Sequence, residues 1–253
     1  MRTDQIWQNR TVAESFLTGV RGAIPFATEQ IDIALRVLDQ LQIPIQQVAD
    51  LGCGDGTIAH ALLTHYPEAH VTAIDFSEPM LEQATQRLQP FGDRVTLLQA
   101  DLYTPDWQES LGKQPEGKQP EGKQPEGTFD AIVSGYCIHH LPDDRKQALY
   151  REIFHLLRSG GAFLNIEHVA SASPWVETLF NDTLVESIYQ WHQSQDGVLS
   201  REEVGQRFVY REDKKANILA PVELQCEWLR AIGFQHADCF FKFFELSVFG
   251  GVR

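Results

Sequence analysis

The sequence predicts an α/β fold built on a mostly parallel sheet. Two observations carry this prediction: five apolar, β-rich runs alternate with helical patterns, and a glycine-rich turn lies directly after the first run. Strands that alternate with helices form parallel sheets with right-handed crossovers. With 253 residues, of which 43% are hydrophobic, the chain is long enough for one such domain and a modest cap.

The elements follow a regular order up to residue 166. Apolar residues recur at helical spacing between the runs, and Ser77 suits the N-cap of the second helix. The third helix should end in Arg158-Ser159-Gly160-Gly161, a basic last turn followed by glycines. The expected strands cover 48–51, 70–76, 95–100, 129–134 and 162–166, and the expected helices cover 57–66, 77–88 and 143–157.

The rest of the chain breaks this alternation. Ser173-Pro174 opens a helix, and Pro221 opens another that stops at Gly233. Residues 237–252 alternate like two strands with a short link, which implies an antiparallel hairpin at one sheet edge. The helix after Pro174 has apolar positions at Val176, Leu179, Phe180, Leu184, Ile188 and Trp191.

We expect a single domain over residues 1–253 with three additions. Residues 1–42 should form an N-terminal helical lid, and residues 171–220 should form a helical cap insertion. The aromatic face of this insertion is either part of the core or part of the acceptor pocket. Residues 112–127 hold three Gly-Lys-Gln-Pro-Glu repeats. Gly and Pro in each unit disfavour a helix or a paired strand, so we expect a solvated low-complexity loop. A repeat that binds a partner is the alternative.

Composition narrows the class of protein. The formal net charge is −14, and no basic cluster exceeds Lys214-Lys215, so a nucleic-acid partner is not expected. No apolar run reaches the roughly 20 residues that cross a bilayer, and the polar N-terminus lacks a signal peptide. We therefore expect a cytoplasmic protein without a membrane partner. The four cysteines lack metal-ligand spacing, which predicts reduced thiols and no metal.

A glycine turn connects the first strand to the first of these helices. Gly52, Gly54 and Gly56 allow a tight turn and the close approach of a ligand. The spacing is GxGxG, and Thr57 stands where a dinucleotide fingerprint has its last glycine. Asp50 suits the ammonium and positive sulfur of a sulfonium cofactor. The alternative is a purely structural turn.

Two further acids end the next strands. Asp75 ends the second strand, where a carboxylate can accept both ribose hydroxyls, and Asp101 ends the third, followed by Leu102, where it can accept the adenine amino group. Each acid alone could equally be an N-cap or a turn residue. Together with the glycine turn they predict a nucleoside site at the carboxyl edge of the sheet.

Five segments in this order resemble the motifs of the class I S-adenosylmethionine-dependent methyltransferases. They are VADLGCGDG, VTAIDFSEPML, LLQADL, FDAIVSG and LRSGGAFL, between residues 45 and 167. The resemblance implies a Rossmann-like, seven-stranded sheet of order 3-2-1-4-5-7-6 with strand 7 antiparallel, and S-adenosylmethionine as cofactor. Carried over by position, it implies roles for Gly52, Gly54 and Gly56 under the cofactor, Asp75 at the ribose, Asp101 and Leu102 at the adenine, Phe76 and Met80 beside its ring, and the Ser134 backbone at the methionine end.

Both ends of the chain are similar in layout to the carboxy-S-adenosylmethionine synthases of tRNA wobble modification. The similarity lies in residues 10–16, Ile24-Pro25 and the aromatic tail DCFFKFFELSVFGG. Those enzymes hold an extra carboxylate with an arginine in the C-terminal part. Arg207 and Arg211 are the nearby candidates here, and no arginine aligns without a gap. We therefore expect plain S-adenosylmethionine.

The residues after the fourth and fifth strands should face the transferred methyl group. His139 has a pKa type suited to a general base, and Glu167 is the second candidate, although a His-His-Leu turn can be purely structural. We expect a methyltransferase that acts on a small-molecule acceptor by in-line displacement, with a homodimer as one assembly. The alternatives are a tRNA-modification enzyme, either carboxy-S-adenosylmethionine synthase-like or a wobble uridine methyltransferase, and a non-catalytic cofactor-binding module.

Overall fold

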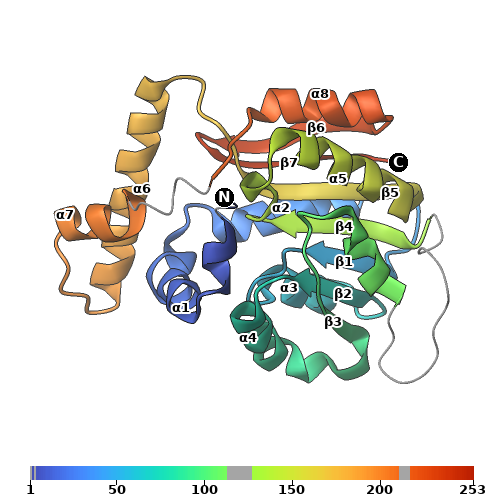
Figure 1. The fold of residues 1–253 in the computed structure, drawn as a ribbon, viewed down its shortest axis with the longest axis horizontal. Coiled ribbons are helices and arrows are strands. Elements are labelled where there is room, and N and C mark those ends of the chain that lie inside the picture. The colour runs from blue at the N-terminus through green and yellow to red at the C-terminus, as the bar shows by residue number, and fades with distance from the viewer. Residues whose placement is uncertain (1, 3, 113–126, 211–216) are drawn as a thin grey trace.

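The computed structural model describes residues 2, 4–112, 127–210 and 217–253, which form one seven-stranded sheet with helices on both faces (Figure 1). The strand order is β3-β2-β1-β4-β5-β7-β6, with β7 antiparallel to both its neighbours, so the predicted order is confirmed. The strands are β1 (Gln47–Leu51), β2 (His70–Asp75), β3 (Val95–Gln99), β4 (Phe129–Gly135), β5 (Leu157–His168), β6 (Gln235–Phe243) and β7 (Leu246–Val252).

Helices cover the sheet in two layers. One layer packs against the side chains of Val48, Val71 and Ala131, and the other packs against those of Ile74, Ile132 and Phe163. The first layer comprises α2 (Ala27–Leu38), α3 (Thr57–His65) and α4 (Glu78–Leu88), and the second comprises α5 (Asp143–Leu156), α8 (Val222–Ile232) and the short helix η4 (Pro105–Gly112).

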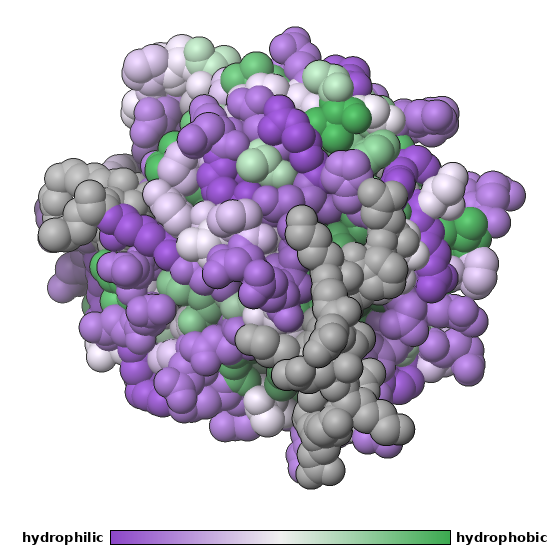
Figure 2. Space-filling model, turned by 45° about the vertical axis from the view of Figure 1, so that its right-hand side comes forward, coloured by the Kyte–Doolittle hydropathy of each residue, from purple (hydrophilic) through white to green (hydrophobic). Residues whose placement is uncertain are grey.

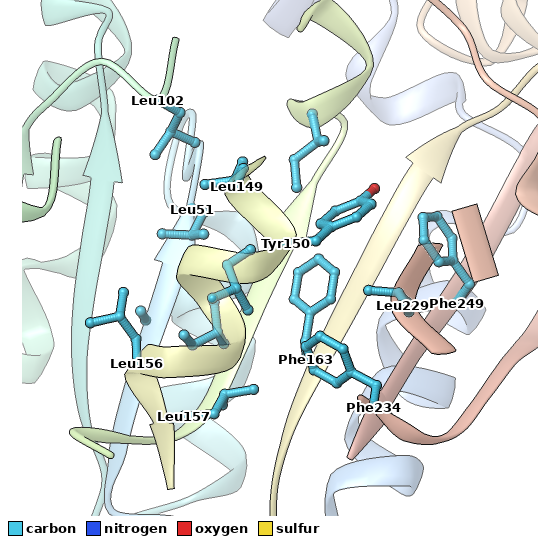
Figure 3. Packing of buried hydrophobic residues seen from close by; sticks show 14 of the residues in the cluster. Leu51, Leu102, Leu149, Tyr150, Leu156, Leu157, Phe163, Leu229, Phe234 and Phe249 are labelled. Carbon is cyan, nitrogen blue, oxygen red and sulfur yellow. The ribbon is translucent and has the colours of Figure 1, made fainter. Parts of the chain in front are cut away.

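The core beneath α5 is aromatic (Figure 3). Tyr150 of α5 and Phe163 of β5 are fully buried, with ring centroids 5.4 Å apart. The phenol of Tyr150 donates a hydrogen bond of 2.6 Å to Gln225 of α8. A buried tyrosine needs such a partner. The contact therefore ties α5 to α8 and sets the second layer on the sheet.

A third apolar cluster lies beside the sheet and forms a cap. It joins α1 (Arg10–Gly19) and η2 (Arg21–Ala23) to α6 (Pro174–Ser194), α7 (Arg201–Val204) and η6 (Gly205–Val209). The short helix η1 (Asp4–Gln8) packs on α1 through Trp7, whose ring centroid is 5.3 Å from that of Phe16. In Figure 1, α1 lies between α6–α7 and the strands. The buried members of this cluster are Val20, Ala23, Val185, Ile188, Val204, Phe208 and Val209.

Two local expectations were wrong. Arg158 to Gly161 do not end a helix in a loop, because β5 begins at Leu157 directly after α5. Gly160 takes a φ of +81°, and the backbone pairs with the C-terminus, since Gly160 N–H donates to the Arg253 carbonyl and Arg253 N–H to that of Gly161. On α6, Leu179 does not belong to the buried face, because it is 38% exposed. Val185, which was not among the expected apolar positions, is buried.

On the face shown in Figure 2 most residues are hydrophilic, and smaller apolar areas lie between them. Within the described residues, no helix combines the length and the apolar character that crossing a bilayer requires. The predicted low-complexity loop, residues 112–127, lies almost wholly outside the described residues, as does Arg211.

Candidate functional site

A cavity opens at the carboxyl ends of β1, β2 and β4, between the sheet and the cap. The glycine turn and the residues after β2 and β4 line one side, and α1, η2 and α6 line the other. The lining residues include Trp7, Phe16, Leu17, Arg21, Gly52, Gly54, Asp75, Phe76, Met80, Gly135, Tyr136, His139, His140, His168, Phe180, Leu184 and Phe208. Ligands of open α/β sheets bind at this edge.

The glycines of the turn are required for different reasons. Gly52 (φ +68°) lies against Cys137, whose Sγ would be 2.2 Å from an added Cβ. Gly54 (φ +54°) has open space on its Cβ side and lines the cavity. Gly56 packs against Leu88 of α4 and does not line the cavity. Of the three glycines, Gly52 and Gly54 line the cavity.

Asp50 is fully buried beneath the turn. Its Oδ2 accepts the backbone N–H of Ala59 at 3.0 Å, whereas its Oδ1 has no hydrogen-bond partner among the described residues. Burial raises the pKa of Asp50 to about 7. An orphaned carboxylate oxygen under a glycine turn fits a ligand that brings a positive group.

Asp75 lies where β2 meets the cavity. Its Oδ2 accepts the Gly54 N–H and its Oδ1 the Ser77 N–H, each at 2.8 Å. Burial raises the pKa of Asp75 to about 6, against the opposing effect of these N–H donors. A carboxylate offers about four lone-pair sites, so two remain for hydroxyl groups of a ligand.

A smaller cavity continues past Phe76 and holds an arginine that sequence reasoning missed. Arg2 pairs through two nitrogens with Asp101, and its guanidinium lies 4.3 Å from the ring centroid of Tyr103 and 5.6 Å from that of Phe76. Burial raises the pKa of Asp101, but the Arg2 pair outweighs it and holds the pKa below its usual value. Leu102 lines the same cavity. The acid expected at the adenine is thus already paired.

His139 lines the main cavity and forms a buried pair with Glu167, which is not among the lining residues. His139 lies on η5 (Ile138–His140) after β4, and its Nδ1 is 2.5 Å from Oε1 of Glu167, near the end of β5. Glu167 also accepts the backbone N–H groups of His139 and His168. Burial lowers the pKa of His139 well below its usual range and raises that of Glu167 to about 7. The imidazole is therefore neutral at neutral pH.

A second histidine–carboxylate pair, absent from the sequence expectations, lies beside the first. His168 Nε2 is 2.6 Å from Oε2 of Glu245, and Ser171 donates to Oε1 at 2.5 Å. The rings of His139 and His168 are 5.7 Å apart, and both line the cavity. Glu245 lies in the β6–β7 turn. The sequence signal that could have identified it is an acidic residue between two apolar strands.

The remaining expected residues divide between the cavity and its supports. Phe76 and Met80 line the cavity. Ser134 is fully buried and donates its hydroxyl to the Leu51 carbonyl, so Gly135 and Tyr136 line the cavity in its place. Arg207 is exposed, lies 5.3 Å from the Phe208 ring and is not among the lining residues.

Comparison with known proteins agrees with this geometry. Residues 49–163 match the family model described as a methyltransferase domain. Over 94% of the chain and 90% of the relative, the sequence is 22% identical to a carboxy-S-adenosyl-L-methionine synthase of Nautilia profundicola. A malonyl-[acyl-carrier protein] O-methyltransferase of Anoxybacillus flavithermus is 37% identical over 30% of this chain and 29% of its own.

Solved structures share the fold. A putative S-adenosylmethionine-dependent methyltransferase of Methanococcus maripaludis superposes with a TM-score of 0.55 at 20% identity, covering 96% of this chain and 91% of that one. The methyltransferase SibL gives a TM-score of 0.57 at 18% identity over 88% of this chain. The chain spans about half the length of SibL, 53%.

The sheet order, the glycine turn and the strand-end acids define a Rossmann-like protein of the S-adenosylmethionine-dependent methyltransferase class. More particularly, residues 49–163 match a methyltransferase domain, the protein is an S-adenosylmethionine-dependent methyltransferase, and its cofactor is S-adenosylmethionine. The open Cβ side of Gly54 on the cavity fits this cofactor, which supplies a methyl group on a positively charged sulfur. Asp50 lies buried beneath the glycine turn, with an unpartnered Oδ1, and is not among the lining residues of either cavity.

Proposed function

We propose that the enzyme methylates a small-molecule acceptor by in-line displacement and that His139 is its general base. The observation that carries the proposal is that His139, which is paired with the buried Glu167, lines the same cavity as the glycine turn. Positioning is the main requirement of such a transfer, and a base is needed when the acceptor must lose a proton.

Each partner of the pair has a separate task in this proposal. A neutral His139 takes the proton of an acceptor hydroxyl or N–H group as the acceptor oxygen or nitrogen bonds to the methyl carbon. Glu167 holds the imidazole through Nδ1, which leaves Nε2 as the basic nitrogen. The carboxylate also stabilises the imidazolium that results.

The walls of the cavity support a small, partly apolar acceptor. Phe16, Leu17, Phe180, Leu184 and Phe208 of the cap line the same cavity as the two histidines, and the Phe180 ring lies 5.7 Å from that of His168. We propose that η1, α1 and η2 act as the lid and residues 171–220 as the cap over one domain. The predicted lid, residues 1–42, also included α2. We leave α2 out of the lid because it packs against β5 and β7 of the sheet.

We further propose a cytoplasmic enzyme without a nucleic-acid partner. The net charge of −14 and four cysteines that form no disulfide support this placement. Light scattering of the purified protein measures its molar mass and so distinguishes a homodimer from a monomer.

Labelled cofactor tests the acceptor class. The protein is incubated with methyl-labelled S-adenosylmethionine and either a small-metabolite extract or an RNA extract. We expect label in the metabolite fraction and its loss in His139→Ala. Lys242→Ala, on the exposed β6 edge, is the control and should keep full activity. Label that enters only RNA would contradict the proposal.

The second candidate function is that of a carboxy-S-adenosylmethionine synthase. It is favoured by similarity over nearly the full length of such enzymes, including 24% identity over 98% of the one from Desulfotalea psychrophila. Mass spectrometry of ligand co-purified from cells separates the two candidates. We expect plain S-adenosylmethionine, and a cofactor about 44 mass units heavier would make the synthase the leading function.

A further inference from the structure

His168 is a second imidazole on the main cavity, and the methyl-transfer proposal does not use it. It ends β5, its side chain is 13% exposed, and it lines the cavity together with His139. Its Nε2 lies 2.6 Å from Oε2 of Glu245, whereas its Nδ1 has no hydrogen-bond partner among the described residues. A ring nitrogen without a partner, on a residue that lines a cavity, is available to a polar group of a ligand.

Glu245 holds the ring of His168 from behind the cavity wall. Its carboxylate is buried, is not among the lining residues, and also accepts the hydroxyl of Ser171 at 2.5 Å. The backbone of the pair is fixed as well, because β5 and β7 pair His168 with Leu246 and the Val169 N–H donates to the carbonyl before it at 2.8 Å. In the neutral ring, the carboxylate keeps the proton on Nε2 and leaves a lone pair on Nδ1.

The two histidine–carboxylate pairs are arranged alike. His139 is held through Nδ1 by Glu167, so its other nitrogen, Nε2, remains for the cavity. His168 is held through Nε2 by Glu245, so Nδ1 remains. The ring centroids are 5.7 Å apart, and the ring planes enclose an angle of 71°. The cavity thus carries two neighbouring hydrogen-bond acceptors.

Apolar side chains lie beside His168. The ring centroid of Phe180 is 5.7 Å from that of His168, and Leu184 and Leu246 line the same cavity. In apolar surroundings an acceptor nitrogen needs a donor from the ligand, because a buried polar group without a partner is costly. Two neighbouring acceptors therefore select a molecule that brings two donors on an otherwise apolar body.

We propose that His168 binds a second donor group of the acceptor, next to the group that is methylated. The acceptor is then an apolar molecule with two neighbouring O–H or N–H groups, such as a vicinal diol. The distance supports this class, because hydrogen bonds of about 3 Å must reach two rings whose centroids are 5.7 Å apart. The inference rests on the proposed methyl transfer and defines its acceptor more closely.

The two groups of the acceptor have different fates. The first oxygen or nitrogen bonds to the methyl carbon while the methyl–sulfur bond breaks, and the electron pair of that bond stays on sulfur. The proton of this first group passes to Nε2 of His139. The second group keeps its proton, in a hydrogen bond to Nδ1 of His168. The methylated product has lost one donor, so it should not be methylated again.

Three small probes test the inference on enzyme saturated with S-adenosylhomocysteine, so that no turnover occurs. The probes are benzene-1,2-diol, phenol and 2-methoxyphenol, and NMR titration measures their dissociation constants. Phenol has one donor, and 2-methoxyphenol has one donor beside an oxygen that only accepts. Wild type should bind the diol about 3–10-fold more tightly than either of the others, the range for one neutral hydrogen bond.

Two variants assign this preference to His168. His168→Phe keeps a ring without nitrogen, so it should bind the diol and phenol equally. Glu245→Gln should donate its amide N–H to Nε2, because Ser171 donates to its oxygen, and this moves the ring proton to Nδ1. Nδ1 then donates, so Glu245→Gln should bind 2-methoxyphenol as tightly as the diol. Glu245→Gln leaves the ring in place and tests the inference even if His168→Phe does not fold.

The matched control is His60→Ala, which removes an exposed histidine of α3 that does not line the cavity. It should keep the wild-type preference for the diol. Thermal melts check that each variant is folded.

Three results would overturn the inference. Equal binding of the three probes by wild type would show that no second donor is held. A preference for the diol that persists in His168→Phe would assign it to another residue. Wild type that binds 2-methoxyphenol as tightly as the diol would show that Nδ1 of His168 carries a proton. Failure of the methyl-transfer proposal looks different, because the probes would still be distinguished while no metabolite became labelled.

Discussion

Buried carboxyl groups dominate the site at the scale of single residues. Asp50, Asp75 and Glu167 are each at most 8% exposed, and burial raises the pKa of all three. Each is held by backbone N–H donors: Ala59 for Asp50, Gly54 and Ser77 for Asp75, and His139 and His168 for Glu167. Of the three, Asp75 lines the cavity, whereas Asp50 and Glu167 lie behind its lining residues.

We expect Asp75→Ala to weaken S-adenosylmethionine binding by about 1.5–3 kcal/mol, the range for hydrogen bonds to a charged group. Asp101→Asn should cost less, because the amide oxygen still accepts from an amino group. Calorimetry measures both. Tight NAD binding without S-adenosylmethionine binding would contradict the assignment of both acids.

The raised pKa of Asp50 makes stability depend on pH. An unfolded aspartate ionises near pH 3.9, whereas Asp50 in the folded protein ionises at about 7. Between these values the folded state keeps a proton that the unfolded chain has lost, so stability falls as the pH rises through this window.

Asp50→Asn should remove this contribution. Asparagine cannot titrate, and its oxygen can still accept from Ala59. From pH 4.5 to pH 7.5, the free energy of unfolding of the ligand-free wild type should fall by about 2–3 kcal/mol more than that of the variant. Urea denaturation at the two pH values measures the difference. An equal pH dependence in both proteins would show that Asp50 is already ionised at pH 4.5.

At the scale of elements, Arg2, which precedes η1 and pairs with Asp4 and Asp101, lies in the place expected for the adenine. Cofactor binding there must separate Arg2 from Asp101 and from the Tyr103 ring. A partly exposed ion pair and a cation–π contact are each worth up to about 1 kcal/mol. We expect Arg2→Ala to raise the affinity for S-adenosylmethionine about 3–10-fold by calorimetry. Arg10→Ala, which removes an exposed pair with Glu82, is the control. Weaker binding in Arg2→Ala would instead make Arg2 part of the adenine site.

An element could be predicted from the sequence when the residues that define it lie close together in the chain. The strand, glycine turn and helix around Gly52 lie within a few residues of each other, so sequence spacing defines them. Arg2, Arg21 and Glu245 are ordinary charged residues in their own segments. They reach the site only because the cap and the β6–β7 turn close over the sheet. Their partners lie far away in sequence, 99 residues for Arg2 and Asp101 and 77 for His168 and Glu245. Ser134 could not be placed for the same reason, because its hydroxyl donates to the distant Leu51 carbonyl and turns away from the cavity.

At the scale of the whole molecule, the sheet tolerates a long connection between η4 and β4. The Gly127 and Thr128 N–H groups donate to the His155 and Leu156 carbonyls, so β4 is held from its first residues. We expect deletion of two Gly-Lys-Gln-Pro-Glu units to leave the melting temperature and the cofactor affinity nearly unchanged, because loop length has a small entropic effect. A loss of several degrees would show that the repeat packs on the protein.

The cap also decides when during synthesis the enzyme can first become active. Its core joins segments that are far apart in sequence: the Gly19 carbonyl is hydrogen-bonded to His192, 173 residues later. At about 5–20 residues per second, roughly 10–30 s pass between the translation of these two residues. The glycine turn is translated well before α6, so it forms before the cap can close over it. A nascent chain therefore exposes an open cofactor edge until α6, α7 and η6 have been translated.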